Sequence, residues 1–254
     1  MKRIFLLLLS FVTIAAYTQQ SKIYTVHNIT VKNGQKMAFE AAYKQHVAKF
    51  HKADKEKVRV FEILSGPNAG SYQIVSGPSS YADMDRERSD NTVHGIDLDK
   101  SFFSYLESNG STNYFRLEDS LTLHEDVNAE KTIITIRHIK PAMYGDYFNE
   151  QKRTFKVLHA LKGKFWDNLN LRYYSQLWDG SDPVLVGVRT LKEGFKELES
   201  GYFGPMNDGN PSFKDVYIQH YGTLDWDKRE KLYDTAEVSR EQFIRRLRTD
   251  LSSQ

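Results

Sequence analysis

The chain contains one unit twice, and this internal repeat constrains the fold more than any other feature. The run V-K-N-G-Q-K begins at Val31, and the related run I-K-P-A-M-Y begins at Ile139. Each leads into a segment with helical spacing, which ends in H-V-A-K-F-H at His51 and in T-F-K-V-L-H at His159. Both pairs of positions are 108 residues apart. A repeat of this length indicates one supersecondary unit present in two tandem copies.

In the first copy, alternating β-formers predict strands and apolar residues at helical spacing predict helices. The expected elements are a strand at 23–32, a helix at 35–53, strands at 57–64 and 72–76, helices at 79–88 and 96–106, and a strand at 113–123. The second copy predicts a strand at 132–140, a helix at 144–162, strands at 169–177 and 184–189, a helix at 192–199 and a strand at 216–224. The order β-α-β-β-α-β is the split β-α-β pattern of ferredoxin-like units.

A single unit of this kind leaves one face of its sheet bare. The first strand carries apolar residues on both of its faces, with Ile23 and Ile29 on one and Tyr24 and Val26 on the other. A sheet that is buried on both faces has this composition. We therefore expect an α+β fold in which two tandem ferredoxin-like repeats, 21–127 and 128–225, pair their sheets as an intramolecular α/β barrel.

The remaining residues, 226–254, are rich in charge and predict a C-terminal helical tail. The run S-R-E-Q from Ser239 is a capping box, and Phe243, Leu247 and Leu251 recur at every fourth position. We expect an amphipathic helix that docks on the outside of the barrel. The alternative is a helix that contacts a protein partner.

This arrangement resembles the dimeric α/β-barrel superfamily in its fused two-repeat form. The strand–Lys–Asn/Pro–Gly approach to the first helix is similar to NIPSNAP-like and antibiotic-biosynthesis-monooxygenase-like members. The resemblance covers Ile23 to Leu224. It implies the fold, and it implies a range of functions, since the superfamily includes cofactor-free oxygenases, haem enzymes, isomerases and proteins without known activity.

Residues 1–20 have the pattern of a secretory signal peptide. Lys2 and Arg3 precede an apolar stretch at 4–16 that is too short to span a bilayer, and Ala15 and Ala16 fit a cleavage site. The chain has no cysteine, which excludes both disulfides and a lipid anchor on cysteine. We expect a bacterial protein, periplasmic or secreted, without a membrane anchor after cleavage.

Without this segment the chain carries equal numbers of basic and acidic residues. A neutral chain lacks the basic surface that nucleic acids require, so no nucleic-acid partner is predicted. The 15 tyrosines and 15 phenylalanines indicate a core, or a cavity, lined by rings. We therefore expect the partner to be a small-molecule ligand.

No phosphate-binding glycine loop, nucleophile elbow or H-E-x-x-H motif occurs in the sequence. His27, in the middle of the first strand, is the candidate catalytic residue, as a general base or as a metal or haem ligand. The alternative for His27 is a buried histidine whose hydrogen bonds only support the structure.

Four further side chains on predicted strands are candidate ligand-binding residues: Arg137, Arg172, Tyr174 and Tyr217. An arginine that faces a cavity can bind an anionic group. Alternatively, Arg137 pairs with a carboxylate such as Glu62, and the polar strand faces belong to an exposed sheet edge.

The other histidines predict no metal site. His51 and His159 lie at equivalent helix ends, where the helix dipole favours histidine. His46, His94 and His124 have the pattern of surface residues. No cofactor is predicted, and haem is left open because the resembled superfamily includes haem enzymes.

We therefore predict an exported small-molecule-binding α/β-barrel protein, with a cofactor-independent monooxygenase-like activity as its enzymatic form. The alternative is a non-catalytic periplasmic interaction module that uses the barrel as a platform. The sequence leaves open whether the protein is an enzyme.

Overall fold

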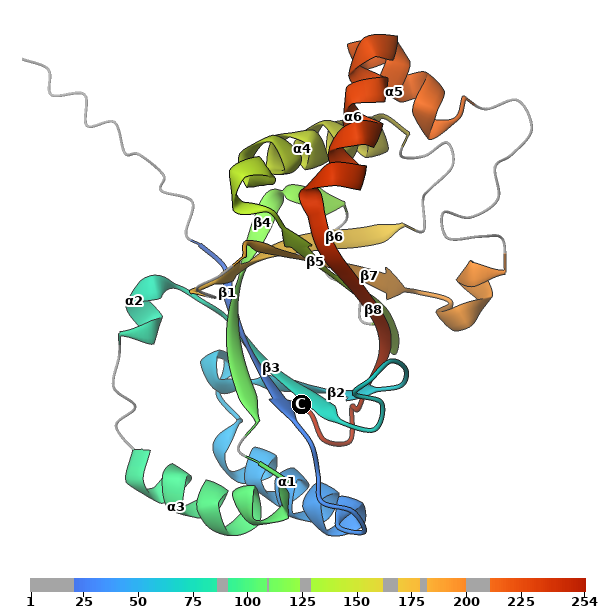
Figure 1. The fold of residues 1–254 in the computed structure, drawn as a ribbon. Coiled ribbons are helices and arrows are strands. Elements are labelled where there is room, and N and C mark those ends of the chain that lie inside the picture. The colour runs from blue at the N-terminus through green and yellow to red at the C-terminus, as the bar shows by residue number, and fades with distance from the viewer. Residues whose placement is uncertain are drawn as a thin grey trace, which may run out of the picture.

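The fold is known from a computed structural model. It describes residues 21–85, 91–108, 110–123, 129–161, 169–178, 182–199 and 211–254. The described residues form a closed barrel with the strand order β1-β3-β2-β8-β5-β7-β6-β4, and all neighbouring strands are antiparallel. In the view along the barrel, helices cover two opposite sides of it (Figure 1). The predicted α/β barrel is thus confirmed.

The first half of the chain forms four of the strands. They are β1 (Ile23–Ile29), β2 (Val58–Ile63), β3 (Tyr72–Ser79) and β4 (Ser111–Leu123). Its helices are α1 (Lys36–Phe50), α2 (Tyr81–Met84) and α3 (Asn91–Ser101), with 3-10 turns at Asp54–Glu56 and Phe103–Tyr105. A capping box between Ser80 and Asp83 begins α2, which lies within the helix predicted at 79–88.

The second half forms the other four strands. They are β5 (Lys131–Ile139), β6 (Asn170–Leu177), β7 (Val184–Leu191) and β8 (Glu237–Leu247). Its helices are α4 (Tyr144–Leu161), α5 (Phe213–Tyr221) and α6 (Thr223–Ala236), with 3-10 turns at Pro141–Met143 and Gly194–Leu198.

Each half has the same strand order. The first sheet reads β4-β1-β3-β2 and the second reads β8-β5-β7-β6, which is the order 4-1-3-2 in both copies. The copies join at two equivalent seams, β2 with β8 and β6 with β4. The duplication inferred from the sequence is therefore a structural repeat, and closure of the barrel leaves no free sheet edge.

The structure corrects the last two elements predicted from the sequence. The residues expected to form the last strand, 216–224, lie in α5 and at the start of α6. A capping box between Ser212 and Asp215 starts α5, and Val216 and Tyr217 lie on its buried side. The capping box and the positions of the buried residues therefore both indicate a helix in this segment.

The residues from Ser239 onward, expected to form a helix, form β8 instead. The helix of the predicted tail lies earlier, in α6. These residues form a strand because the barrel can close only if a fourth strand of the second sheet lies between β5 and β2. Residues Lys131 to Ile139 of β5 pair with β8 along its length, so the strand is stabilised by ladder hydrogen bonds that a peripheral helix would forgo.

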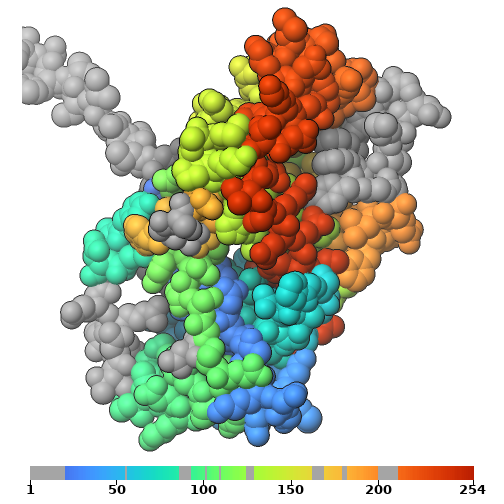
Figure 2. All heavy atoms as spheres, viewed as in Figure 1, coloured from blue at the N-terminus to red at the C-terminus, as the bar shows by residue number. Residues whose placement is uncertain are grey.

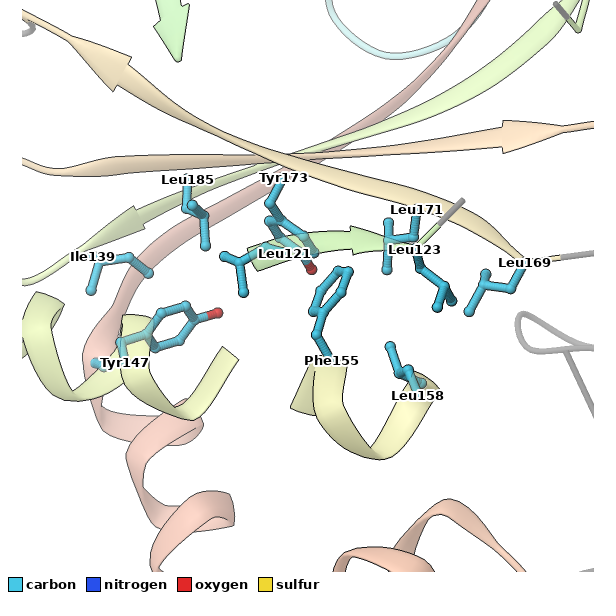
Figure 3. Close-up of a cluster of buried hydrophobic side chains, with 11 residues drawn as sticks. Leu121, Leu123, Ile139, Tyr147, Phe155, Leu158, Leu169, Leu171, Tyr173 and Leu185 are labelled. Atoms are coloured by element: carbon cyan, nitrogen blue, oxygen red, sulfur yellow. The ribbon is translucent and has the colours of Figure 1, made fainter. Parts of the chain in front are cut away.

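Two hydrophobic cores fill the spaces between the sheets and their helices. In the second half, Tyr147 and Phe155 of α4 pack against Leu121, Tyr173 and Leu185 of the sheet (Figure 3). In the first half, the core between the sheet and α1 with its neighbours contains buried aromatic and aliphatic residues: Phe39, Tyr43, Val58, Val60, Tyr72, Ile74, Phe102 and Leu251. Both outer layers are therefore closely packed.

The residues after β8 continue along β2, beyond the stretch of β2 that pairs with β8. Arg248 N and Ser253 N donate to Val60 O and Val58 O, and Ser252 Oγ and Ser253 Oγ accept from Val60 N and Val58 N. In the space-filling view, the red C-terminal part of the chain, which includes β8, lies against the cyan β2–β3 turn (Figure 2). There, Leu64 N donates to Ile244 O. The end of the chain thus completes the seam that β8 begins.

Residues 1–20, where the signal peptide is predicted, lie outside the described residues. In the described part of the chain, no helix is both long enough and apolar enough to cross a membrane.

Candidate functional site

An open cavity of about 1540 Å³ occupies the interior of the barrel and extends to its end beside α1 and the C-terminal residues. The interior of an eight-stranded barrel is normally just wide enough to be filled by side chains or to hold one small ligand. Ligand pockets in proteins usually measure about 300–1,000 Å³. Because the outer cores are filled, the interior of the barrel is the main space in which the described chain could hold a ligand.

One part of the cavity wall is apolar. It consists of Ile134, Val186 and Val188, with Phe115, Ile136, Tyr174 and Phe243 packed against them. The isoleucines occupy alternate positions of β5 and the valines alternate positions of β7, because successive strand residues point to opposite faces. The positions between them face the outer core.

Arg245 of β8 lies in the polar part of the wall. Its Nη1 donates to Gln73 Oε1 at 2.8 Å and its Nε donates to Thr132 Oγ1 at 3.0 Å. The guanidinium carbon lies 3.8 Å from the centre of the Phe61 ring, a cation–π contact. Arg245 is thus held rigidly by three strands, β2, β3 and β5.

The surroundings of Arg245 disfavour its charge. Arg245 is half-buried, and its partial removal from water lowers its pKa to about 10, with smaller contributions from the positive charges of Arg172 and Arg59. The nearby Tyr174 acts in the opposite direction. At neutral pH the guanidinium stays charged, so the cavity holds a positive charge with two further arginines around it.

Most of the carboxylates that line the cavity lie on segments outside the strands. Glu40 lies on α1, Asp54 on a 3-10 turn, Glu130 before β5 and Asp250 after β8. Glu62 is the exception on a strand, and it accepts hydrogen bonds from Lys36 and from Arg246 at 2.6 Å. None of these carboxylates affects the pKa of Arg245, so its charge is largely uncompensated.

Two of the four predicted ligand-binding residues line this cavity. Arg172 and Tyr174 occupy alternate positions of β6 and point to the interior. The ring of Tyr174 meets Tyr24 of β1 edge to face, with 5.5 Å between the ring centres. The polar face of this strand, visible in the sequence, thus belongs to a polar-lined barrel. The role of the two residues in binding stays a prediction.

Arg137 lies on the other face of the sheet. Its Nε is 3.2 Å from Glu237 Oε1, and its guanidinium stacks on the Tyr173 ring with its carbon 5.4 Å from the ring centre. Gly187 makes room for this stack, since a Cβ there would lie 3.2 Å from Tyr173. The alternative prediction, an ion pair between Arg137 and a carboxylate, is therefore confirmed, but the partner is Glu237 and not Glu62.

Tyr217 and His27 also lie outside the cavity lining. Tyr217 is in α5, fully buried, and its hydroxyl donates to Glu150 Oε1 at 2.8 Å. His27 is half-buried on β1, with its Nδ1 2.7 Å from Thr112 Oγ1 on β4. The structure therefore does not bring His27, Arg137 and Tyr217 to one site with Arg172.

Sequence reasoning missed Arg245. The signal was present, since Phe243, Arg245 and Leu247 alternate as a strand does. An arginine at the middle position hid the alternation of apolar residues. Sequence reasoning also placed His46 at the surface, but it is buried, with 2% of its surface exposed, and lies beside His51 and His94.

The cavity offers haem a poor fit. Its described lining contains no histidine or methionine, and the chain has no cysteine. Tyrosine is thus the one usual axial ligand of haem iron present there. The group of His46, His51 and His94, whose ligand nitrogens lie within 4.8 Å of one another, could instead hold a metal ion outside the barrel.

Comparisons with known proteins support the architecture. No protein-family model matches the sequence, and a comparison with curated proteins finds no match. Among solved structures, an anthrone oxidase-like protein is similar over 91% of this chain and 92% of its own, with a TM-score of 0.54 and 9% identity.

Two candidate monooxygenases are also similar in structure. The protein from Fusobacterium nucleatum has a TM-score of 0.52 and 11% identity over 90% of this chain and 93% of its own. The protein from Lactobacillus acidophilus has a TM-score of 0.50 and 8% identity over 92% of this chain and 96% of its own. At these identities the similarity is one of fold, which in this chain is a two-repeat α/β barrel.

Proposed function

We propose that the barrel interior binds a small molecule with an apolar body and one anionic group. The observation that carries the proposal is the hollow barrel, in which a positive charge stands beside an apolar wall. Arg245 and Arg172 would bind the anionic group, and the valine and ring surface would hold the body.

The cavity itself favours a ligand. A cavity of this size is open to water, so its apolar wall is hydrated. An apolar body would contact the wall formed by β5 and β7 and remove its apolar surface from water. Most of the binding energy would come from this wall.

The charge at Arg245 favours an anion. Burial and two neighbouring arginines destabilise the charged guanidinium, and an anion relieves both effects. A hydrogen bond to a charged group contributes about 1.5–3 kcal/mol, or roughly 10- to 150-fold in affinity. Charge should therefore decide between ligands of equal size.

The test compares 2-naphthoate with 2-naphthylmethylamine, which share an apolar body and differ in the sign of the charge. Calorimetric titration of the wild-type protein should show tighter binding of naphthoate. Arg245→Met should weaken naphthoate binding at least about 10-fold. Arg240→Met, on the same strand but exposed, should leave it unchanged.

A second variant guards against a folding defect in Arg245→Met. Val188→Trp keeps Arg245 and places a larger side chain in the cavity beside the apolar wall, so it should weaken the binding of both compounds. Equal affinity for the two naphthyl compounds would refute anion selectivity. Binding that persists in both cavity variants would place the ligand elsewhere.

A cofactor-independent oxygenase is a second candidate function. The similar solved structures include candidate monooxygenases and an anthrone oxidase-like protein, and a ring-lined cavity suits a flat aromatic substrate. Anthrone is therefore the probe. One atom of O₂ becomes the new carbonyl oxygen of anthraquinone, and the other leaves as water with the two hydrogens of the methylene carbon. An oxygen electrode should record uptake that Val188→Trp reduces, and uptake at the uncatalysed rate would remove this candidate.

We further propose that the chain is exported, because residues 1–20 have the charge and apolar pattern of a signal peptide. N-terminal sequencing of the protein from the periplasm should find a start between Tyr17 and Ser21. A start at Met1 would contradict export by cleavage.

A further inference from the structure

Three histidines from two helices meet on the outer side of the first sheet. His46 lies in the last turns of α1, His51 directly follows that helix, and His94 lies in α3. The Nε2 atom of His46 is 3.2 Å from Nε2 of His51 and 3.2 Å from Nε2 of His94. All three rings thus present the same type of nitrogen to one point.

The hydrogen bonds of the other ring nitrogens fix the tautomers of two of these rings. Nδ1 of His46 is 2.8 Å from the Asp97 carboxylate, and Nδ1 of His51 is 2.6 Å from the Glu56 carbonyl oxygen. Both partners are acceptors, so each Nδ1 carries the proton. In the neutral rings both Nε2 atoms then carry lone pairs, which face each other at 3.2 Å. A cation between them removes this repulsion.

We propose that His46, His51 and His94 bind a divalent metal ion of the zinc class through their Nε2 atoms. Zinc binds histidine nitrogen at about 2.0–2.1 Å in tetrahedral geometry, which places two ligand nitrogens roughly 3.3 Å apart. Both separations from His46 are close to this value. Imidazole ligands also suit copper and nickel, so zinc names the class by its commonest member.

The surroundings resemble the second sphere of a metal site. Histidine ligands usually donate their other N–H to a carboxylate or a backbone carbonyl, which orients the ring. Asp97 takes this role for His46 and the Glu56 carbonyl takes it for His51. Lys49 holds the other carboxylate oxygen of Asp97 at 3.1 Å. Burial lowers the pKa of His46, which favours the neutral ring that a metal requires.

The site combines one buried ligand with two half-buried ones. Three protein ligands leave a fourth position of a tetrahedral ion for water or another small ligand. The metal would also tie α3 to the end of α1. Since both helices cover the outer face of the first sheet (Figure 1), this site is separate from the barrel interior.

The test uses protein without a histidine tag, stripped with EDTA, dialysed and titrated with Zn²⁺ by calorimetry. Wild-type protein should bind one Zn²⁺ per chain, and saturating Zn²⁺ should raise its melting temperature. His46→Ala and His94→Ala should abolish this binding. His220→Ala, which removes an exposed histidine of α5, should bind as the wild type does.

A further variant separates the second sphere from the ligands. Asp97→Asn should retain one site but weaken Zn²⁺ binding about 10- to 100-fold. Since His94 is half-buried, His94→Ala should keep the fold even if His46→Ala does not. The proposal is overturned if wild-type protein binds no more Zn²⁺ than folded His94→Ala, which would leave a hydrogen-bonded histidine cluster only.

Discussion

Replacement of Leu251 by alanine should destabilise the whole protein. Leu251 follows β8 near the end of the chain, yet only 2% of its surface is exposed. It packs in the core of the first half with Val58 and Val60 of β2 and Phe39 of α1. The end of the chain therefore contributes to a core formed mainly by residues about 200 positions earlier.

The expected magnitude follows from the atoms removed. Leucine exceeds alanine by three carbon groups, each of which contributes about 0.8 kcal/mol when buried, or about 2.4 kcal/mol in total. The cavity left behind adds to this loss, and buried Leu→Ala changes cost about 2.7–5.0 kcal/mol in a protein where the series was measured. Because domains are stable by about 5–15 kcal/mol, the loss is a large share of the total.

Urea denaturation followed by circular dichroism measures the effect. Leu251→Ala should lower the free energy of unfolding by about 2.5–5 kcal/mol without a change in the urea dependence. The control is Leu224→Ala, since Leu224 is 77% exposed, and it should change the free energy by less than about 0.5 kcal/mol. If Leu251→Ala behaves like the control, the terminal segment is not part of the core and the closure of the barrel by its C-terminal residues is refuted.

Two further predictions concern hydrogen bonds to carboxylates. Hydrogen bonds from Arg248 lower the pKa of Glu40 and of Asp250, so their stabilising contribution is present above about pH 4.5 and is lost as the pH falls through the lowered values. Urea denaturation between pH 6 and 3 should show a steeper loss of stability for wild type than for Arg248→Gln. If stability falls equally with pH in both proteins, the hydrogen bonds from Arg248 do not stabilise the two carboxylates. Tyr217→Phe removes the hydroxyl that donates to buried Glu150 and should cost roughly 1.5–3 kcal/mol, whereas an unchanged midpoint would show that water replaces it.

The first copy could be predicted well because its local signals agree with its tertiary role. Gly34, with φ 76°, ends the approach to α1, and the turn around Gly70 joins β2 to β3 as the sequence indicated. Both residues of the capping box of α2 are also visible in the sequence. At these positions propensity, turn chemistry and burial point to the same structure.

The last strand could not be predicted because two periods fit the same residues. Phe243, Leu247 and Leu251 recur at every fourth position, which fits a helix. Phe243 and Leu247 would also lie on the same face of a strand, because their separation of four residues is a multiple of the strand period of two. Arg245 fills the position between them and faces the cavity. A polar residue at an inward position made the strand pattern unrecognisable, and the demand for barrel closure is not visible locally.

The candidate sites differ in the same way. Arg172 and Tyr174 could be placed on one face of β6 by counting alternate residues, since one strand contains both. The histidine group could not, because His94 approaches His46 only through the packing of α3 on α1, and 48 residues separate them. Neighbours on one element are readable from the sequence, and neighbours across elements depend on the fold.

One strand combines closure of the barrel with the charge of its interior. β8 joins the two halves at β2 and carries Arg245, whose hydrogen bonds reach Gln73 of β3 in one half and Thr132 of β5 in the other. A valine at position 245 would continue the apolar wall and fill less of the space, but it would make none of these bonds. The guanidinium therefore links the two copies across the seam and at the same time defines the charge that a ligand would meet. If an anion binds there, it should stabilise the closed barrel as a whole, because its binding site includes the junction of both halves.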